Sequence, residues 1–201
     1  MNARNRGLAP AAPAHDVGER VAAVDWLQLG ADLDAQGAAL IERLIPPAEC
    51  GALVALYPCD ELFRSRVVMA RHGSGRGEYQ YFSYPLPALI GALRETLYAR
   101  LAPTANRWNE ALGVDARFPD RHAKFIARCH AAGQQRPTPL LLRYGADDYN
   151  CLHQDLYGEH VFPLQVVLLL SEPGHDFEGG EFVMTGQHPR MQSRPIVLPL
   201  R

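Results

Sequence analysis

The sequence has few cysteines, and their spacing argues against both a disulfide framework and a zinc site. The four are Cys50, Cys59, Cys129 and Cys151, with no CxxC pair among them. Zinc modules and thioredoxin-like redox centres normally show paired cysteines at short spacing. So sparse a set is typical of reduced thiols in the cytoplasm, which is the location we predict. We interpret Cys151 as a small buried hydrophobic residue.

Long apolar runs, internal repeats and a strong charge of one sign are also missing. No run approaches the roughly 18 apolar residues of a membrane span, and no apolar stretch follows Arg4 and Arg6, which argues against a secretory signal. A net charge of -2 and a pI near 6.4 provide no overall attraction for nucleic acid or an anionic membrane. Any nucleic-acid binding must therefore depend on a local patch.

The 201 residues are enough for one domain with a sizeable core. Residues 1–18 are rich in Ala, Pro and Gly without periodicity, which predicts a disordered leader. Residues 19–135 are predicted to form a helical and hairpin support region, and residues 136–201 the first part of a β core. Within the support region we expect a strand over 38–45, a helix from Ala48 to about Tyr57, a leucine-striped helix over 89–113 interrupted at Pro103, and a helix over about 120–132.

Residues 60–84 predict a β-hairpin that combines basic and aromatic side chains. The first arm and its Gly-rich turn carry Arg64, Arg66, Arg71 and Arg76, and the second arm carries Tyr79, Tyr81, Phe82 and Tyr84. Arginine binds phosphates and aromatic rings stack on exposed bases, so this surface fits single-stranded nucleic acid or a flipped base. Aromatic residues are also common in ordinary strands that pack on a core, and this alternative stays open.

The densest group of signals lies in residues 139–184. An apolar strand over 140–144 runs into a turn-rich break, and the near-continuous apolar run over 162–170 predicts a strand buried on both faces. A further short strand is expected after Gly179 and Gly180.

Between these strands lies Cys-Leu-His-Gln-Asp, which contains the single His-x-Asp of the chain. In a strand, His153 and Asp155 would point to the same face. A neutral nitrogen ligand beside an anionic oxygen ligand suits Fe(II), as two-thirds of a 2-His-1-carboxylate site. A lone motif of this length also arises by chance, so its meaning depends on its context.

That context resembles the iron(II)/2-oxoglutarate-dependent dioxygenases of the prolyl-4-hydroxylase-like branch. The shared order is strand-Tyr-turn, His-x-Asp, apolar strand and Gly-Gly-x-Phe. The stretch is most similar to small bacterial oxygenases assigned to oxidative demethylation of damaged nucleic acid. The resemblance implies iron ligation by His153 and Asp155, and 2-oxoglutarate contact by Tyr144, although Tyr149 is an equal candidate.

The sequence departs from this family after the motif. The resemblance implies a second His about fifty residues or more after Asp155, and an Arg or Lys about ten residues later that anchors 2-oxoglutarate. The sequence ends at Arg201 without either, so we expect a chain cut short at its C-terminus. His160, His175 and His188 fall too early, and we interpret them as surface residues.

We therefore expect an α+β fold in which N-terminal helices buttress a double-stranded β-helix, or jelly roll, incomplete at its C-terminus. The resemblance implies an Fe(II)- and 2-oxoglutarate-dependent dioxygenase that uses O2, with ascorbate as auxiliary reductant and no catalytic residue beyond the metal ligands. Alkylated nucleic-acid bases, peptidyl proline and small molecules remain alternative substrates. The alternative of another class is a non-catalytic fragment or interaction module whose open strand edges favour self-association.

Overall fold

The computed structural model describes residues 15–155, 158–186 and 194–200. The predicted leader lies outside the described residues up to residue 14, and the first helix begins at His15. The helices are α1 (His15–Ala22), α2 (Trp26–Gln36), α3 (Pro47–Val54), α4 (Ala88–Ala111) and α5 (His122–Ala131), with two 3-10 turns at Asp60–Leu62 and Met69–His72.

The two helices expected around residues 48–57 and 120–132 are confirmed as α3 and α5. The long helix α4 is also confirmed, but the predicted interruption at Pro103 is wrong, because α4 continues through that residue. Pro103 lies on the exposed side of the helix, where water can satisfy the carbonyl group that its missing N–H leaves free. The strand predicted over 38–45 is wrong as well. That segment is irregular and has no partner strand, although it buries Leu44 and Ile45 against the helices.

A helical core holds this part of the molecule together. Ten buried apolar residues from α1 to α4 form one cluster, among them Val17, Val21, Leu53 and Leu97 at 1–3% exposure. The carboxylate of Glu49, in the first turn of α3, is also buried, and it accepts hydrogen bonds of 2.9 and 3.0 Å from Arg20 of α1. A buried carboxylate is tolerated only when paired in this way, so the contact aligns α1 with α3.

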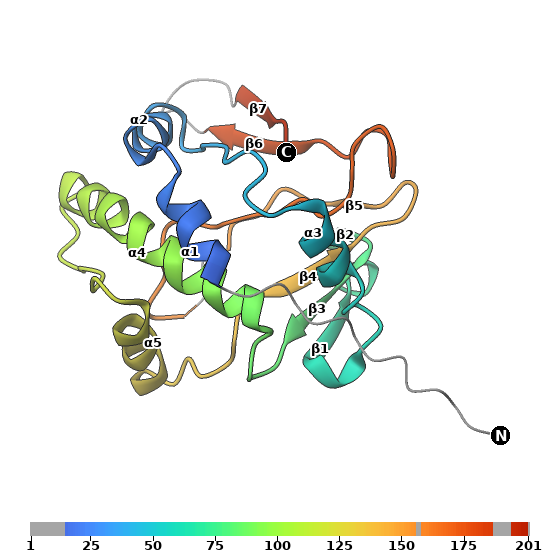
Figure 1. Ribbon diagram of the computed structural model, residues 1–201, viewed down its shortest axis with the longest axis horizontal. Coiled ribbons are helices and arrows are strands. Elements are labelled where there is room, and N and C mark those ends of the chain that lie inside the picture. The colour runs from blue at the N-terminus through green and yellow to red at the C-terminus, as the bar shows by residue number, and fades with distance from the viewer. Residues whose placement is uncertain (1–14, 156–157, 187–193, 201) are drawn as a thin grey trace.

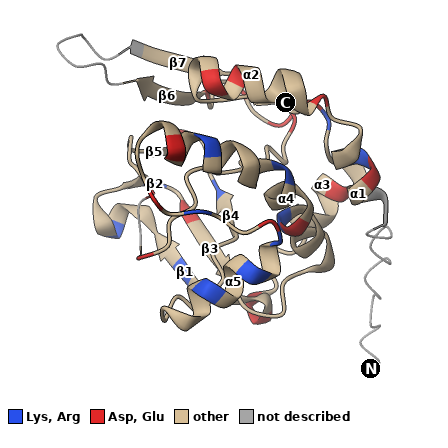
Figure 2. Cartoon of the chain, turned by 90° about the vertical axis from the view of Figure 1, so that its left-hand side faces the viewer, with Lys and Arg blue, Asp and Glu red and all other residues tan. Residues whose placement is uncertain are grey.

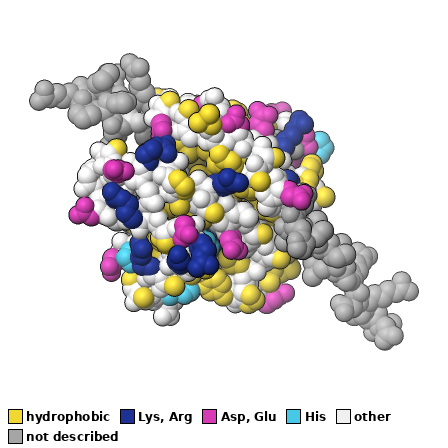
Figure 3. Space-filling model, turned by 60° about the vertical axis from the view of Figure 1, so that its left-hand side comes forward, with side chains coloured by type: hydrophobic (Ala, Val, Ile, Leu, Met, Phe, Trp, Pro, Cys, Tyr) yellow, Lys and Arg dark blue, Asp and Glu magenta, His cyan; other side chains and the backbone are white. Residues whose placement is uncertain are grey.

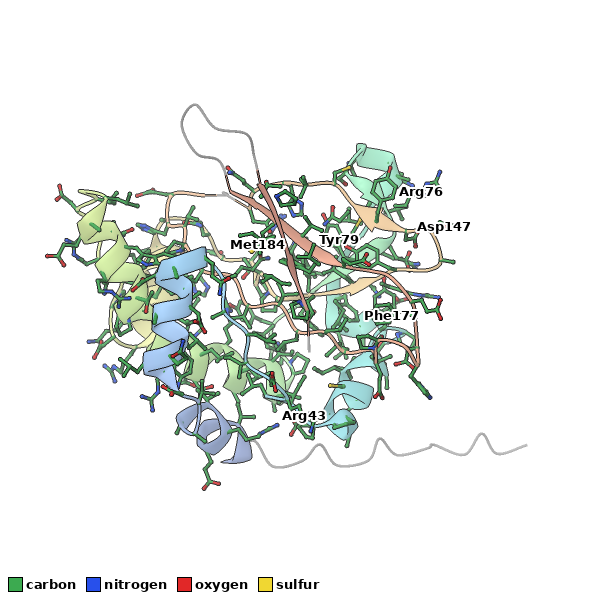
Figure 4. All side chains as sticks on the ribbon, turned by 90° about the horizontal axis from the view of Figure 1, so that it is seen from above. Arg43, Arg76, Tyr79, Asp147, Phe177 and Met184 are labelled. Atoms are coloured by element: carbon green, nitrogen blue, oxygen red, sulfur yellow. The ribbon has the colours of Figure 1, made fainter. Side chains whose placement is uncertain are left out.

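The strands form three small antiparallel sheets. The largest has the order β1–β3–β4, the second pairs β2 with β5, and the third pairs β6 with β7. Their bounds are β1 (Phe63–Val68), β2 (Gly75–Arg76), β3 (Glu78–Phe82), β4 (Leu140–Arg143), β5 (Tyr149–Asn150), β6 (Phe182–Gly186) and β7 (Arg194–Leu198). Helices α1, α2, α4 and α5 lie on the left of the molecule, whereas α3 and the strands β1–β5 lie on the right (Figure 1). In the view from above, the β6–β7 hairpin crosses over the part of the main sheet that carries Tyr79 (Figure 4).

The α+β class, the hairpin over 60–84, the strand that begins at Leu140 and the strand that follows Gly180 are confirmed. The described strands do not join into the two facing sheets of a jelly roll. The segment 162–170 is the main difference, because it forms no strand within the described residues and is not buried on both faces. Phe162, Leu164, Leu168 and Leu170 pack against the helical core, whereas Val166 and Val167 are 46% and 38% exposed.

The His-x-Asp motif does not lie in a strand, so the common face that a strand would give His153 and Asp155 is not what brings them together. Residues 151–155 follow β5, which ends at Asn150, and they belong to no strand within the described residues. Within the described residues, no helix has the length and apolarity needed to cross a membrane.

Candidate metal centre

The segment that carries His153 and Asp155 is attached to the glycine-rich turn of the β1–β3 hairpin. Strand β5 pairs with β2, with Gly75 opposite Asn150, and the Cys151 N–H then donates to the Ser74 carbonyl at 2.9 Å. Gly75 has φ 132°, and a Cβ atom there would collide with the carbonyl oxygen of Tyr149. Only glycine permits so close an approach of the two backbones. The hairpin turn therefore sets the position from which the motif departs.

The imidazole of His153 presents one specific nitrogen to Asp155. Its Nδ1 lies 2.7 Å from the carbonyl oxygen of Cys151. A carbonyl can only accept a hydrogen bond, so Nδ1 carries a proton, and in the neutral imidazole Nε2 is the nitrogen with the free lone pair. This Nε2 lies 3.5 Å from Oδ1 of Asp155. A backbone carbonyl on the second ring nitrogen is the usual support of a metal-binding histidine.

The carboxylate of Asp155 is held in a matching way. Its Oδ2 accepts a 3.1 Å hydrogen bond from the side-chain amide of Gln165, which leaves Oδ1 facing His153. Gln165 is exposed, whereas Leu164 and Leu168 of the same segment pack on the helical core. The segment predicted as a doubly buried strand therefore contacts both the core and the motif.

These two side chains fit a shared metal ion. Ligand atoms about 2.0–2.2 Å from one ion lie roughly 3 Å apart at an angle near 90°, so a small adjustment from 3.5 Å would suffice. Both groups are about half exposed, which leaves an ion accessible to co-substrates. No cluster of three or more His, Cys, Asp and Glu side chains suited to a metal occurs within the described residues. The pair is therefore a two-ligand arrangement in this part of the chain.

The other predicted site residues lie around the motif or away from it. Cys151 is exposed, so its interpretation as a buried residue is wrong; the lack of a strand at 151–155 leaves it outside any packed layer. His175 is exposed. His160 is half-buried, and its backbone N–H donates a hydrogen bond to the side-chain oxygen of Gln134 at 2.9 Å. His188 lies outside the described residues.

Tyr144 is 45% exposed, and its ring lies so close to Gly77 that a Cβ atom at Gly77 would come within 2.8 Å of the ring.

The hairpin predicted to bind nucleic acid lies beside this pair. Tyr79 and Tyr81 share the face of the main sheet opposite the buried Gln80, with their ring centroids 5.4 Å apart. Burial raises the pKa of Tyr81; Tyr79 and the carboxylate of Asp155 act in the same direction, and Arg64 opposes them. The guanidinium of Arg64 stacks over the Tyr81 ring at 4.2 Å. The aromatic face of the hairpin therefore lies within electrostatic range of the His-x-Asp motif.

The four hairpin arginines differ in their freedom to bind a ligand. Arg64 stacks on Tyr81, and Arg66 pairs with Glu78, which also lies 3.6 Å from Arg143. The hydrogen bond from Arg66 lowers the pKa of Glu78 and keeps that carboxylate ionised. Arg71 and Arg76 are exposed and make no side-chain hydrogen bond or ion pair within the described residues. In Figure 4, Arg76 lies at the rim of the molecule near Asp147.

Two residues of this site carried no recognisable signal in the sequence. Gln165 lies inside an apolar run, and its polar side chain is the one feature of the sequence that distinguishes it from its neighbours. Gly75 is one of several glycines in a turn, and only the close approach of β5 distinguishes it.

A family model described as "Oxygenase, catalysing oxidative methylation of damaged DNA" matches residues 77–201, more than half of the chain. The matched region begins just before β3 and includes both motif residues and Gln165. The chain belongs to this oxygenase family.

The chain is also 51% identical over 119 residues to uncharacterized proteins of Mycobacterium tuberculosis strains CDC 1551 / Oshkosh and ATCC 25618 / H37Rv. The match covers 59% of this chain and 51% of each relative, so the chain spans about half the length of these curated relatives. No solved structure matches it.

Proposed function

We propose that the protein is an Fe(II)- and 2-oxoglutarate-dependent dioxygenase that oxidatively demethylates alkylated bases of nucleic acid. The observation that carries this proposal is the mutual orientation of His153 and Asp155. Nε2 and Oδ1 face each other at 3.5 Å, and the remaining polar atom of each side chain is occupied by another group. Family membership supports the oxygenase class and the choice of damaged DNA as substrate.

Iron held by His153 and Asp155 would supply O2 activation with 2-oxoglutarate as co-substrate, which couples oxidative decarboxylation to hydroxylation of a substrate C–H bond. The chain's own contribution is orientation. The Cys151 carbonyl keeps the proton on Nδ1, so His153 presents the nitrogen that binds a metal. Gln165 restrains rotation of the Asp155 carboxylate. A hydroxylated N-methyl group leaves the base as formaldehyde, so no further protein nucleophile is required.

The aromatic face of the hairpin is proposed to hold the target base. Tyr79 and Tyr81 offer ring surfaces beside Asp155, and base–aromatic stacking typically contributes about 1–3 kcal/mol per base. Arg71 and Arg76, which are free within the described residues, would then contact phosphates. Arg64 and Arg66 are engaged with Tyr81 and Glu78, so they support the face rather than bind phosphates.

For 2-oxoglutarate, Tyr144 remains the proposed contact. Burial raises its pKa, so its hydroxyl stays protonated and able to donate to a carboxylate. Ascorbate keeps its proposed role as auxiliary reductant, and the double-stranded β-helix remains the proposed architecture of the complete core.

Metal binding can be tested with metal-free protein under anaerobic conditions. Co(II), titrated as a spectroscopic substitute for Fe(II), should bind the wild type with visible absorption bands, and His153→Ala and Asp155→Ala should lose that signal. The chain contains a matched control, because His175 Nδ1 lies 2.9 Å from Oδ1 of Asp176 on the surface. His175→Ala should bind like the wild type. Equal binding by His153→Ala would refute the assignment.

The substrate assignment needs a second measurement. Succinate release from 2-oxoglutarate should rise on addition of N-methylated single-stranded DNA. Arg71→Glu with Arg76→Glu should reduce this stimulation and leave the release without DNA unchanged. No stimulation by any nucleic acid would remove the proposed substrate class, and peptidyl proline or a small molecule would then be the next candidates.

A non-catalytic nucleic-acid-binding module is the second candidate. It is favoured by the presence of two, rather than three, ligand-type side chains at the motif within the described residues. Two protein ligands should bind metal weakly, with fast exchange. DNA binding without any succinate release would support this candidate over the enzyme.

A further inference from the structure

We propose that the outer face of α5, together with the pocket between α5 and α4, forms a second contact site for single-stranded nucleic acid, where phosphates bind the helix and a base enters the pocket. This inference rests on nucleic acid being the substrate, as proposed above.

The basic character of α5 stands out against the nearly neutral chain. Residues 117–136 contain five Arg or Lys and one acidic residue, while the whole chain has a net charge of -2. Arg121, Lys124 and Arg128 recur at helical spacing and are all exposed. Figure 2 shows basic residues along α5, and Figure 3 shows Lys and Arg with His beside them on the lower part of the surface, where α5 lies.

This basic face is presented by a rigid support. The opposite side of α5 buries Phe125 and Cys129 in a cluster with Tyr98 of α4, and Phe118 and Phe162 pack against it. Arg128 also donates to the Arg117 carbonyl at 2.7 Å, which restrains its side chain near the rest of the patch. A charge array on a packed helix loses little further freedom on binding a phosphate chain.

Adjacent to this face, a shallow and open depression of about 390 Å³ lies between α5 and the first half of α4, and this depression is the pocket. This volume lies at the lower end of the range for small-molecule sites and accommodates a nucleobase. It combines aromatic, apolar and basic walls with one carboxylate, and its lining includes Tyr84, Leu86, Arg94, Glu95, His122, Ile126 and His130.

The chemistry of these walls suits a flat, polar ring next to a phosphate. The rings of Tyr84 and His130 meet edge to face with centroids 6.2 Å apart, which provides ring surface for stacking. Arg94 makes only long contacts, 3.4 Å to the Tyr84 hydroxyl and 3.5 Å to Thr138, so its guanidinium can turn toward an anion. Burial, with the charge of Arg94, lowers the pKa of His122 to about 4, so a neutral imidazole can bond a base edge.

The pocket is also close to the proposed catalytic face along the chain. Tyr84 follows Tyr81 by three residues, which is a backbone span of about 10 Å at most. A single strand bound on α5 with one base at Tyr84 can therefore continue toward Tyr81 and Asp155. The two surfaces would act together: α5 would bind the phosphates of the single-stranded nucleic acid, and the hairpin would hold the reacting base.

The test is fluorescence anisotropy of a labelled 12-nucleotide oligo(dT) with metal-free full-length protein at several salt concentrations. The double variant Arg121→Glu, Arg128→Glu should weaken binding at least 10-fold and lower the salt slope by about 1.4, because each lost phosphate contact accounts for about 0.7 on a single strand. The matched control Arg43→Glu, Arg100→Glu makes the same charge change on other exposed surfaces and should weaken binding much less. Arg121→Gln, Arg128→Gln serves if the Glu variant unfolds.

Tyr84→Ala separates the pocket from the helix. We expect about a 5- to 100-fold loss of affinity without a change in salt slope, because stacking does not release counterions. Equal losses in the α5 and control variants, or no loss in either, would overturn the inference, as would tighter binding of duplex than of single strand. If the α5 variants bind DNA normally while His153→Ala still loses metal, this inference fails and the metal-centre proposal stands. If the wild type binds no DNA, the proposed substrate fails with it.

Discussion

The helical core and the His-x-Asp segment are held in place by different kinds of interaction. Around α1 and α4, apolar side chains at 1–8% exposure fill one continuous cluster. Around His153 and Asp155, residues 151–155 are exposed and belong to no strand. Their positions depend on the contact of Cys151 with Ser74, the bond of Gln165 to Asp155, and the close approach at Gly75.

This difference separates stability from function within the chain. Buried area in the helical core contributes to the free energy of unfolding but does not orient the ligands. A few polar contacts orient the ligands and contribute little to global stability. Mutations in the two regions should therefore produce distinct measurable effects.

The largest effect on stability is expected in the helical core. Leu97→Ala removes a side chain that is 3% exposed in α4, and the resulting cavity should lower the free energy of unfolding by about 2–5 kcal/mol. Urea denaturation followed by circular dichroism measures this change. Leu112→Ala, at 76% exposure directly after the same helix, is the control and should cost less than about 0.5 kcal/mol. Similar costs for both variants would contradict the assignment of the core.

Gly75→Ala tests the junction between the two regions. A side chain at φ 132° is strained and collides with Tyr149, so we expect a loss of about 2–3 kcal/mol or local detachment of β5 from β2. Amide hydrogen exchange should show lost protection at Cys151 above all. In Gly51→Ala, where the added Cβ meets nothing within 4 Å, protection should be unchanged. Unaltered exchange at Cys151 in Gly75→Ala would show that the turn does not position the motif.

Gln165→Leu should affect metal binding and leave stability nearly unchanged. Loss of the amide frees the Asp155 carboxylate to rotate, and losses of this kind typically lower metal affinity about 10- to 100-fold. Co(II) titration measures the affinity, and urea denaturation measures stability. The exposed Gln28, which bonds Asp32 at 2.9 Å within α2, provides the control variant Gln28→Leu. Normal affinity in Gln165→Leu would remove Gln165 from the site.

The smallest expected effect is a dependence of stability on pH at α5. Because burial lowers the pKa of His122 to about 4, the unfolded chain binds a proton at this residue between about pH 6.5 and 4 and the folded chain does not. The free energy of unfolding should therefore decrease as the pH is lowered from about 6.5 to 4, by about 1 kcal/mol after allowance for partial exposure. His122→Gln should show a shallower dependence than the wild type. Parallel pH profiles for the two proteins would exclude this contribution.

Hydrophobic periodicity, and the glycines that follow helices, predicted much of the fold. The Leu stripe of α4, the glycines after α4 and α5, and the Arg/aromatic hairpin all carry local signals, and the structure contains these elements where they were expected. The failures fall where local signals are ambiguous. An apolar run such as 162–170 predicts burial but not which face is covered, and a strand at 38–45 requires a partner that the local sequence does not specify.

By itself the sequence determined the α+β class, the main helices and hairpin, and the residue types of a His-x-Asp motif, because each depends on near neighbours in the chain. Only the tertiary structure decided which atoms of His153 and Asp155 face each other, that Gln165 and Gly75 support them, and that Tyr81 lies beside Asp155. These relations join segments tens of residues apart. They depend on packing and on donors that find acceptors across space, which no local pattern encodes.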